Sequence, residues 1–431
     1  MKQQKNYAFT NWAGNQQGVA ASYFQPETEA ELIEIIQQHQ QIRLVGTGHS
    51  WSAVCLTPHA LINLDHYNRV IHLNREQLQL TVQAGIKLWQ LNEYLDQQGL
   101  ALSNLGSIAK QSLAGAISTG THGSGINFQI LASQIETFTL IKANGEKVTL
   151  HHQRDEQLFN LAVVNLGCLG VISEITLRVV PAFNLHDYTV AVPFQQALNK
   201  LSELVQNTHH FKMWWFPHTE NMVLYRYQRT KEPRNDSRFR QWLMDEFISV
   251  GIYRTLLRLG HLNKPWRKQI NRLLVLNFNK PLDRIEKSYR VFNVPEPPLH
   301  RETEWAFDLA VAVPLLADYK KMIEQSEHCI NFIQEIRFTK ADAYALSPCY
   351  QRDTIWLGVY NADNAGWEKL LSDFEQLARK YNGRPHWGKE FTPDHNYLQA
   401  SYPALQQFNQ LRKEWDAEEK FSNDFIRKIF S

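Results

Sequence analysis

The segment VGTGHSWS, residues 45–52, combines two glycines with a histidine in a short loop behind an apolar strand. Gly46 and Gly48 leave room for backbone N–H groups, including those of Thr47 and Ser50, to approach a phosphate. His49 adds a nucleophilic imidazole to the same turn. The third glycine and the helix of a GxGxxG motif are missing, so a Rossmann fold is disfavoured. Taken alone, the glycine pair is explained equally well by a plain turn.

A second glycine-rich segment, SLAGAISTGTHGSG at residues 112–125, places hydroxyl side chains between glycines. Such a run supplies backbone donors with little steric bulk, which suits a pyrophosphate. The alternative is a flexible surface loop, but Leu113 and Ile117 would then need burial. Two such loops are more specific than either alone, so we expect them to hold one phosphate-bearing cofactor.

The second half of the chain carries charged motifs that could act on a substrate. Glu335 and Arg337 alternate in EIR and therefore face the same side of a predicted strand, while Lys389 ends HWGK. A carboxylate beside two cations stays ionised and could orient or deprotonate a hydroxyl group. Arg337 is a permanent cation, suited to stabilising negative charge that develops during a reaction. The pattern alone favours the blander interpretation of an ion pair on a solvated face.

The bulk properties describe a globular protein with reduced thiols. Its 431 residues exceed one ordinary core, and a net charge of +2 implies neither a nucleic-acid partner nor another strongly charged one. Cys55, Cys168, Cys329 and Cys349 form no CxxC pair, so we expect no metal site. No secretory signal and no apolar span of ~20 residues is apparent, so we expect a cytoplasmic protein.

The elements that must position these motifs divide near residue 182. Residues 1–182 mix helices with short strands in an α+β pattern, beginning with a helix at 26–38 that Thr28 and Glu31 cap. Segments 60–85 and 134–151 alternate as antiparallel strands do. Residues 183–431 predict a second α+β domain with an antiparallel sheet, from strands at 211–217, 222–228, 331–339 and 353–361 and a helix at 366–383.

A basic, helix-like stretch occupies residues 229–280. Its Arg and Lys side chains alternate with large apolar ones, among them Arg238, Arg240, Trp242, Phe247, Arg254, Arg258, Leu256, Lys264, Trp266, Arg267, Lys268 and Arg272. We favour a solvated helical insertion that caps the second domain. The alternative is an amphipathic segment that makes weak peripheral contact with an anionic membrane.

These motifs together resemble the vanillyl-alcohol-oxidase-type flavoproteins. The two glycine loops are similar to those of their FAD-binding (PCMH-type) domain, and NLGCLGVISEITLRVVPAF, residues 165–183, is similar to its closing segment. EIRFTKADAYALSPCYQRDT, GRPHWGKEF and SNDFIRKIF narrow the resemblance to the aldonolactone oxidases. That group includes gulonolactone, galactonolactone and arabinonolactone oxidases, with the alditol oxidases as relatives.

The resemblance implies an FAD-binding domain at residues 1–182. A substrate-binding cap domain follows at 183–431, with a C-terminal tail that returns to the FAD domain. His49 matches the histidine that carries FAD covalently, and the backbone near Gly170 and Ile172 would contact the cofactor. The cofactor-binding residues expected on this basis are Gly46, Thr47, Gly48, His49, Ser50, Ser112, Gly115, Ala116, Thr119, Gly120, His122, Gly123, Gly170 and Ile172.

The resemblance also implies the catalytic residues. Glu335 and Arg337 match the pair that faces the flavin and the substrate, and Lys389 matches a lysine of the same site. Ser112, Glu335 and Lys389 are expected to contact the substrate. His122 is expected to support its loop or touch the flavin.

The activity that the resemblance implies is oxidation of a hydroxyl group of a sugar 1,4-lactone of the D-arabinono, L-gulono or L-galactono kind. Hydride would pass to FAD, and O2 would reoxidise it to give hydrogen peroxide, with Gly120 leaving room for oxygen. Two alternatives remain. One is a lactone dehydrogenase with another electron acceptor, and the other is an alditol (xylitol or sorbitol) oxidase. Alditol oxidases place a histidine and a threonine where this chain has Gly358 and Tyr360, which favours a lactone. HWGKEFT, in contrast, is closer to the alditol group.

Overall fold

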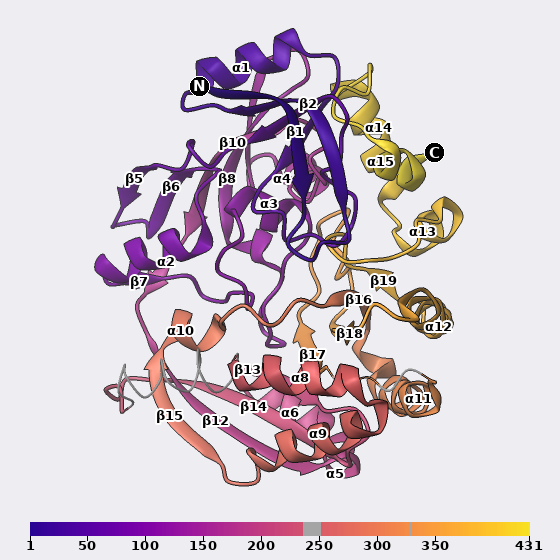
Figure 1. The fold of residues 1–431 in the computed structure, drawn as a ribbon. Helices are drawn as coiled ribbons and strands as arrows, with labels where there is room; N and C mark the ends of the chain where they lie inside the picture. The colour runs from indigo at the N-terminus through magenta and orange to yellow at the C-terminus, as the bar shows by residue number, and fades with distance from the viewer. Residues whose placement is uncertain (236–250, 328–329, 331) are drawn as a thin grey trace.

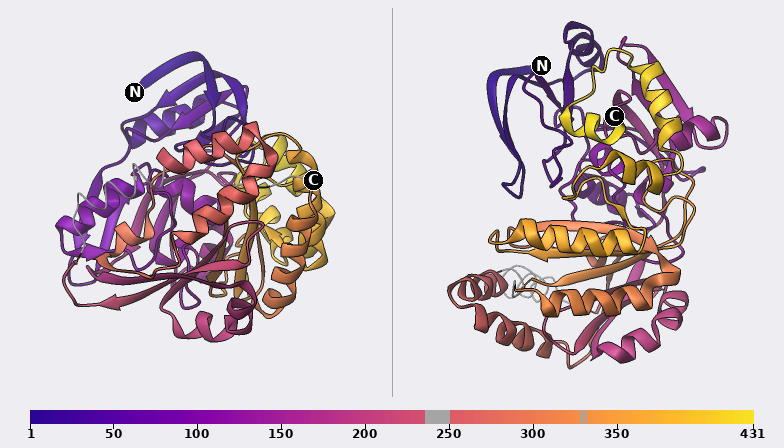
Figure 2. Two further views of the ribbon diagram at one scale, coloured as in Figure 1. Left: turned by 60° about the horizontal axis from the view of Figure 1, so that its bottom comes forward. Right: turned by 90° about the vertical axis from the view of Figure 1, so that its right-hand side faces the viewer.

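Figure 1 shows the fold in a computed structural model, which describes residues 1–235, 251–327, 330 and 332–431. The first half of the chain forms the upper part of this view, and a broad sheet from the second half forms the lower part. The right-hand view of Figure 2 shows helices on the outer side of that sheet. Arg238, Arg240, Trp242, Phe247 and Cys329 lie outside the described residues.

The N-terminal sheet has four strands, in the order β1 (Lys2–Thr10), β2 (Gln17–Gln25), β4 (Ala60–Asn63) and β3 (Ile42–Val45). Helix α1 (Glu29–Gln38) leads from β2 to β3, and the Thr28 hydroxyl accepts the Glu31 N–H at 3.2 Å, as the capping pattern predicts. Strand β4 pairs in parallel with β2 and β3, so the expectation of antiparallel strands over the whole of 60–85 is wrong at β4. Its side chains are buried throughout, because a strand in the middle of a covered sheet needs no alternation.

An antiparallel sheet of five strands follows, in the order β5 (Val70–Asn74), β6 (Gln79–Gln83), β10 (Val171–Arg178), β8 (Ile135–Ile141) and β9 (Lys147–His151). Strands β8 and β9 are antiparallel, as expected for residues 134–151, and a turn at Asn144-Gly145 joins them. The short elements around this sheet are α2 (Leu88–Gln97), β7 (Leu100–Ala101), α3 (Leu113–Ser118), η1 (Leu131–Gln134), α4 (Glu156–Ala162) and β11 (Val180–Pro181). Helix α3 replaces part of the expected 112–125 loop, and it buries Leu113, Ala116 and Ile117.

The second half of the chain builds an antiparallel sheet that has eight strands among the described residues. Its order is β15 (Leu282–Lys287), β12 (Asn184–Pro193), β14 (Asn221–Thr230), β13 (His210–Trp215), β17 (Gln334–Thr339), β18 (Thr354–Asn361), β16 (Arg301–Asp308) and β19 (Arg384–Pro385). All four strands predicted from aromatic and apolar runs are present in it.

Helices surround this sheet and extend beyond it. They are α5 (Phe194–Asn199), α6 (Leu201–Asn207), α8 (Tyr253–Leu262), α9 (Lys264–Leu276), α10 (Ser288–Phe292), η3 (Leu309–Val311), α11 (Ala312–Gln325), α12 (Trp367–Lys380), α13 (His395–Ser401), α14 (Leu405–Trp415) and α15 (Asp424–Phe430). The predicted helix at 366–383 is α12, and the basic stretch is helical in α8 and α9, although residues 229–230 belong to β14.

The C-terminal segment lies against the N-terminal half, where Figure 1 draws it in yellow beside β1 and β2. The Asn423 side chain donates to the carbonyls of Ala53 and Leu56 at 3.0 and 2.8 Å. The Lys420 ammonium donates to the Ile36 carbonyl at 2.6 Å. These bonds attach the C-terminal segment to helix α1 and to the loop that follows β3.

Candidate active site

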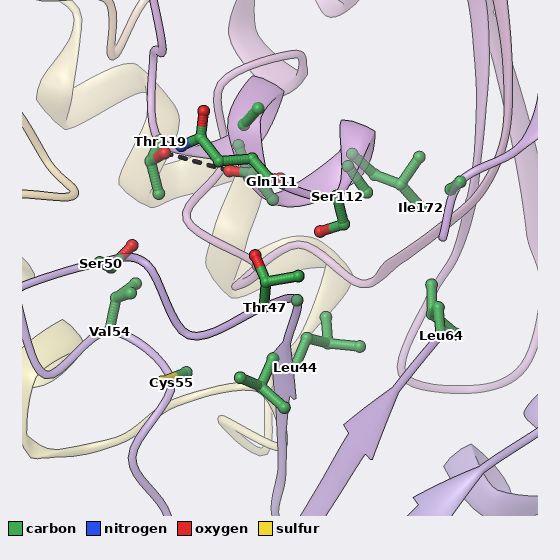
Figure 3. A pocket seen from close by; sticks show the side chains of 18 of the residues that line it. Leu44, Thr47, Ser50, Val54, Cys55, Leu64, Gln111, Ser112, Thr119 and Ile172 are labelled. Atoms are coloured by element: carbon green, nitrogen blue, oxygen red, sulfur yellow. Dashed lines mark hydrogen bonds between the residues drawn. The ribbon is translucent and has the colours of Figure 1, made fainter. Parts of the chain in front are cut away.

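A partly open cavity lies between the loop after β3 and helix α3. Figure 3 shows Thr47 and Ser50 on one side of it and Gln111, Ser112 and Thr119 on the other. The predicted cofactor residues on its lining are Gly46, Thr47, Gly48, His49, Ser50, Ser112, Gly115, Ala116, Thr119, Gly170 and Ile172.

The two glycine loops approach each other so closely that one of the glycines is sterically required. A Cβ atom added at Gly46 would lie 2.2 Å from the Ser112 Oγ. Gly48 has a φ of +69°, a backbone conformation that side chains other than hydrogen rarely tolerate. The cavity therefore has walls of backbone and small polar side chains, as a bound pyrophosphate requires.

Three predicted cofactor residues are not on this lining. Gly120, His122 and Gly123 lie farther along the second loop, where Gly120 faces Pro348 and Gly123 lies against Asn104. The lining also includes residues that the motifs did not predict, among them Arg43, Leu44, Val54, Asp65, Gly85, Gln111, Asn165 and Gly167. They come from elements that precede or follow the glycine loops, and single-sequence patterns carry no signal for such long-range neighbours.

Arg43 is a buried cation in the cavity wall. Its guanidinium donates to the carbonyls of Val54 at 2.9 Å, Leu166 at 2.7 Å and Phe421. Desolvation lowers the pKa of Arg43 from its usual value. The side chain joins the loop after β3, the segment before β10 and the C-terminal segment around one polar group.

His49 is held from three directions. Thr47 Oγ1 lies 2.9 Å from its Nδ1, and Glu296 Oε1 lies 2.9 Å from its Nε2. The ring of Trp12 stacks on it with centroids 5.8 Å apart. Desolvation lowers the pKa of His49, and this outweighs the opposite effect of Glu296, so the ring is neutral at neutral pH. Sequence patterns did not find Glu296, which is 247 residues away.

Glu335 and Arg337 face the same side of β17, as their spacing predicts. Arg337 donates to Glu335 Oε2 at 2.5 Å, to Ser107 Oγ at 2.6 Å and to the His122 carbonyl at 3.2 Å. Glu335 also accepts from Lys212 Nζ at 2.9 Å and from the Trp214 indole at 3.0 Å. Although desolvation raises the pKa of Glu335, Arg337, Lys212 and Trp214 bring it far below its usual value. The pair is buried, so the interpretation of a solvated ion pair is wrong.

Lys389 lies at the junction of the two halves. Its ammonium is 2.6 Å from Glu302 Oε2 and 4.1 Å from the centre of the Trp51 ring. Trp51 belongs to the first glycine loop and donates its backbone N–H to the Gly388 carbonyl at 2.7 Å. HWGK and VGTGHSWS, more than 300 residues apart in the chain, are therefore in direct contact.

The second glycine loop touches the EIR strand in a similar way. The Gly125 N–H donates to the Phe338 carbonyl at 2.7 Å, and the Phe338 N–H donates to Ser124 Oγ at 3.1 Å. His122 stacks on Trp356 of β18 with centroids 3.7 Å apart. Both loops of the first half are thus fixed against strands and loops of the second half that carry charged groups.

His122, Glu304 and His386 form a buried cluster whose ligand atoms all lie within 4.8 Å of one another. His122 Nε2 lies 3.6 Å from Glu304 Oε2. Although desolvation raises the pKa of Glu304, His122 is the first of the neighbours that lower it, to about 2. His386 Nδ1 accepts the Gly388 N–H at 3.0 Å, so its neutral ring carries the proton on Nε2. That tautomer suits a carboxylate neighbour better than a metal ion.

Strand β18 leaves no space for a side chain at the first alditol-oxidase position. A Cβ atom at Gly358 would lie 2.1 Å from the Thr303 carbonyl oxygen. Tyr360, at the second position, is buried near Glu304, and desolvation raises its pKa well above the usual value. At these two positions the chain therefore has a glycine packed against backbone and a buried tyrosine, in place of a histidine and a threonine.

Comparison with known proteins identifies the family. The sequence profile of the D-arabinono-1,4-lactone oxidase family matches residues 175–429, which is more than half of the chain. The chain belongs to this family. A profile described as FAD binding domain matches residues 20–151, and FAD is the cofactor of this first half. The protein is an FAD-linked oxidoreductase of the vanillyl-alcohol-oxidase type, with an FAD-binding domain followed by an antiparallel-sheet domain.

Individual relatives agree with this assignment over the full chain. The protein is similar to L-gulonolactone oxidase of Bos taurus, with 32% identity over 99% of each chain. It is 30% identical to L-gulono-1,4-lactone dehydrogenase of Mycobacterium tuberculosis over 98% of each chain. A crystal structure of cholesterol oxidase from B. sterolicum has the same fold, with a TM-score of 0.84 at 16% identity over 100% of this chain and 97% of that one. Within the described residues, no helix has the length and apolarity to cross a bilayer.

Proposed function

We propose that this chain oxidises a hydroxyl group of a sugar 1,4-lactone, with FAD bonded to His49. The observation that carries this proposal is the contact between Trp51 N–H and the Gly388 carbonyl, 2.7 Å apart, which joins the His49 loop to the Lys389 loop. A hydride acceptor and the groups that bind the reacting alcohol must be adjacent for the transfer to be fast. In this proposal residues 1–182 hold the cofactor, 183–431 cover its reactive end, and the C-terminal tail returns to the first domain.

The walls of the cavity have the small size and the polar groups that binding of FAD requires. A Cβ at position 46 would fill the narrow point between the two loops, and the lining offers hydroxyls from Thr47, Ser50, Ser112 and Thr119. Backbone amides of the glycine loops bind the pyrophosphate, and Gly170 and Ile172 contact the cofactor through their backbone. When bound, FAD supplies the two-electron acceptor.

Arg337 supplies the fixed positive charge of the reaction. Its Nε is buried and has no hydrogen-bond partner within the described part of the chain, so one donor stays available for a ligand. Glu335, bound by three donors, is a weak base and acts mainly by orienting Arg337 toward the flavin and the substrate. A guanidinium fixed in this way stabilises the negative charge that develops as hydride arrives.

Lys389 and Ser112 bind the reacting alcohol. The ammonium of Lys389 stabilises the substrate oxygen while the hydroxyl proton leaves, and Glu302, 2.6 Å from that ammonium, accepts the proton. The aromatic rings of Trp51 and Tyr360 exclude water from this space. A lactone is favoured over an open polyol because Gly358 and Tyr360 stand where the alditol oxidases have a histidine and a threonine.

The electron acceptor is O2, which yields hydrogen peroxide. The similarity to L-gulonolactone oxidases supports O2 as the acceptor. The similarity to an L-gulono-1,4-lactone dehydrogenase supports the alternative, an acceptor other than O2. Measuring oxygen uptake against reduction of an artificial dye decides between them. Dye reduction without any uptake of oxygen would overturn the oxidase.

The test of the proposed function is a substrate panel combined with a colour assay. The purified protein should be yellow, keep its colour after acid precipitation and turn over L-gulono-, L-galactono- or D-arabinono-1,4-lactone faster than xylitol or sorbitol. A protein that stays colourless when riboflavin is plentiful, or that prefers the polyols, contradicts the proposal.

We also propose that α8 and α9 make weak contact with an anionic membrane surface. Leu259, Trp266, Leu273 and Leu276 are exposed on these helices by 38, 51, 60 and 55%. Arg254, Arg258, Lys268 and Arg272 are exposed beside them. Residues 236–250 of the same basic stretch lie outside the described chain. Apolar side chains amid basic ones favour the headgroup region of anionic bilayers.

Sedimentation with phosphatidylserine vesicles tests this contact. Binding should occur at low salt, weaken at high salt and fall in Trp266→Ser and Leu273→Ser variants. Absence of binding at low salt shows that the helices form a solvated cap.

A further inference from the structure

The second ring nitrogen of His49 meets a carboxylate that neither glycine loop provides. Glu296 Oε1 lies 2.9 Å from His49 Nε2, and the two side chains are exposed by only 26 and 10%. Glu296 comes from the segment between α10 and β16, in the second half of the chain. The second half of the chain therefore supplies a carboxylate to the histidine of the first glycine loop.

The segment that carries Glu296 is fixed on both sides. Before it, the Asn293 side chain donates to the Gly106 carbonyl at 2.8 Å, and the Val294 N–H donates to the Ser107 carbonyl at 3.0 Å. After it come two prolines and His300, whose carbonyl accepts the Trp51 indole N–H at 2.9 Å. Proline also restricts the backbone between these anchors. The carboxylate is therefore held at His49 by the fold.

The protonation state of the pair follows from its surroundings. Desolvation keeps the pKa of His49 below its usual value, and the ring is neutral. Desolvation raises the pKa of Glu296, but hydrogen bonds from Lys110 and His49 offset this and bring it below the usual value. A neutral imidazole beside a carboxylate donates from Nε2, which leaves the lone pair on Nδ1, next to the Thr47 hydroxyl.

We propose that Glu296 is the positioning residue for covalent attachment of the flavin, through its hydrogen bond to His49. It selects the tautomer with a nucleophilic Nδ1 and then takes the proton from Nε2 as that nitrogen becomes positively charged. This inference rests on the covalent bond suggested under the proposed function. The arrangement parallels other carboxylate–imidazole pairs, in which the carboxylate fixes the ring and stabilises its charged form.

A bond forms between Nδ1 and the 8α carbon, one C–H bond of the 8α methyl group breaks, and Nε2 loses its proton. The two electrons of the broken C–H bond stay on the flavin ring, which takes up the two released protons and is thereby reduced. O2, the acceptor already named, removes the two electrons and two protons as hydrogen peroxide.

Lys110 offers a matched control. Its ammonium lies 2.6 Å from the other carboxylate oxygen of Glu296, but its side chain is 63% exposed. A Lys110→Met variant removes a charge from the same carboxylate and leaves the bond to His49 in place. It should slow attachment far less than Glu296→Gln does, because the bond between Glu296 and His49 remains.

The experiment follows attachment directly. Protein is purified after a short expression pulse, and the share of flavin that stays with the polypeptide in acid is followed over time in the presence of FAD. Glu296→Gln, nearly equal in shape, should attach flavin about 10- to 100-fold more slowly, the range in which loss of a partner that orients a histidine acts. Formate should restore part of the rate in Glu296→Ala, while formamide, which has no charge, should not.

The outcomes separate this inference from the function it rests on. If the wild-type protein releases its flavin in acid, the covalent bond is absent. The role of Glu296 and the proposed bond between FAD and His49 are then both contradicted. If wild-type flavin is covalent and Glu296→Gln attaches it equally fast, this inference alone is overturned. If Glu296→Gln slows attachment but formate gives Glu296→Ala no rescue, Glu296 serves packing only, and the inference is likewise overturned. Noncovalent yellow flavin in the variants shows that they have folded.

Discussion

Replacing Arg337 with methionine removes the one guanidinium that the proposed mechanism requires. The side chain keeps most of its volume, while Glu335, Ser107 Oγ and the His122 carbonyl lose their donors. Without a fixed cation, charge that develops on the flavin is no longer stabilised. Loss of one preorganised donor of this kind costs about 100- to 1,000-fold in rate, or about 2.7–4 kcal/mol of transition-state stabilisation.

The assay is anaerobic stopped-flow, which measures flavin reduction by lactone without any contribution from oxygen. The midpoint potential of the flavin should fall in the same variant, because the reduced anion is the state that loses its counter-charge. Arg384→Met is the matched control: Arg384 is also buried, and it donates only to backbone carbonyls, of Ser401 at 2.6 Å and Tyr350 at 2.7 Å, among others. That variant should be less stable yet reduce its flavin normally. Reduction by Arg337→Met within about one order of magnitude of the wild type would refute the reasoning.

Three further predictions concern the cofactor cavity and the core. Gly46→Ala should lower the flavin content of purified protein, since its Cβ would lie 2.2 Å from Ser112 Oγ; a normal flavin-to-protein absorbance ratio contradicts this. Arg43→Met should lower the free energy of unfolding by about 3 kcal/mol, because buried carbonyls lose a charged donor, and denaturant titration should show no change if the bonds contribute nothing. Desolvation raises the pKa of Asp342 to about 7. Between about pH 4 and pH 7 the folded state therefore keeps a proton that the unfolded state has released. The contribution of this group to the free energy of unfolding is present at low pH and is lost as the pH rises to about 7. Asp342→Asn should remove that part of the pH dependence of the melting temperature, and an unchanged profile would show that the carboxyl does not titrate there.

Sequence patterns within a few residues predicted many of the helices and strands. The capping pattern at Thr28, the alternation that gave β8 and β9, and the shared face of Glu335 and Arg337 depend only on neighbours within a few residues. Helix α3 was missed because small residues and glycines weaken the helical pattern, while tertiary burial of Leu113 and Ile117 overrides this preference.

The partners of the predicted site residues could not be predicted in this way. Glu296 meets His49 only after the two halves have come together. Lys212 meets Glu335, and Glu302 meets Lys389, only after segments of the second half that are far apart in sequence have packed together. Glu302 and Glu304 flank a threonine in RETEW, a pattern typical of any exposed strand edge, yet both are buried. Without other sequences to compare, nothing in the local pattern distinguishes such carboxylates from surface ones.

The attachment of residues 420–423 to the loop that follows β3 has a consequence for how the protein is made. The carbonyls of Ala53 and Leu56 accept from Asn423, which leaves the ribosome about 370 positions later. The loop that carries part of the cavity lining therefore lacks these bonds during most of translation, and we expect stable cofactor binding only in the complete polypeptide. Loss of only the final dozen or so residues would leave a chain that contains every glycine of the cavity and still lacks the bonds from residues 420–423 that hold the loop behind it.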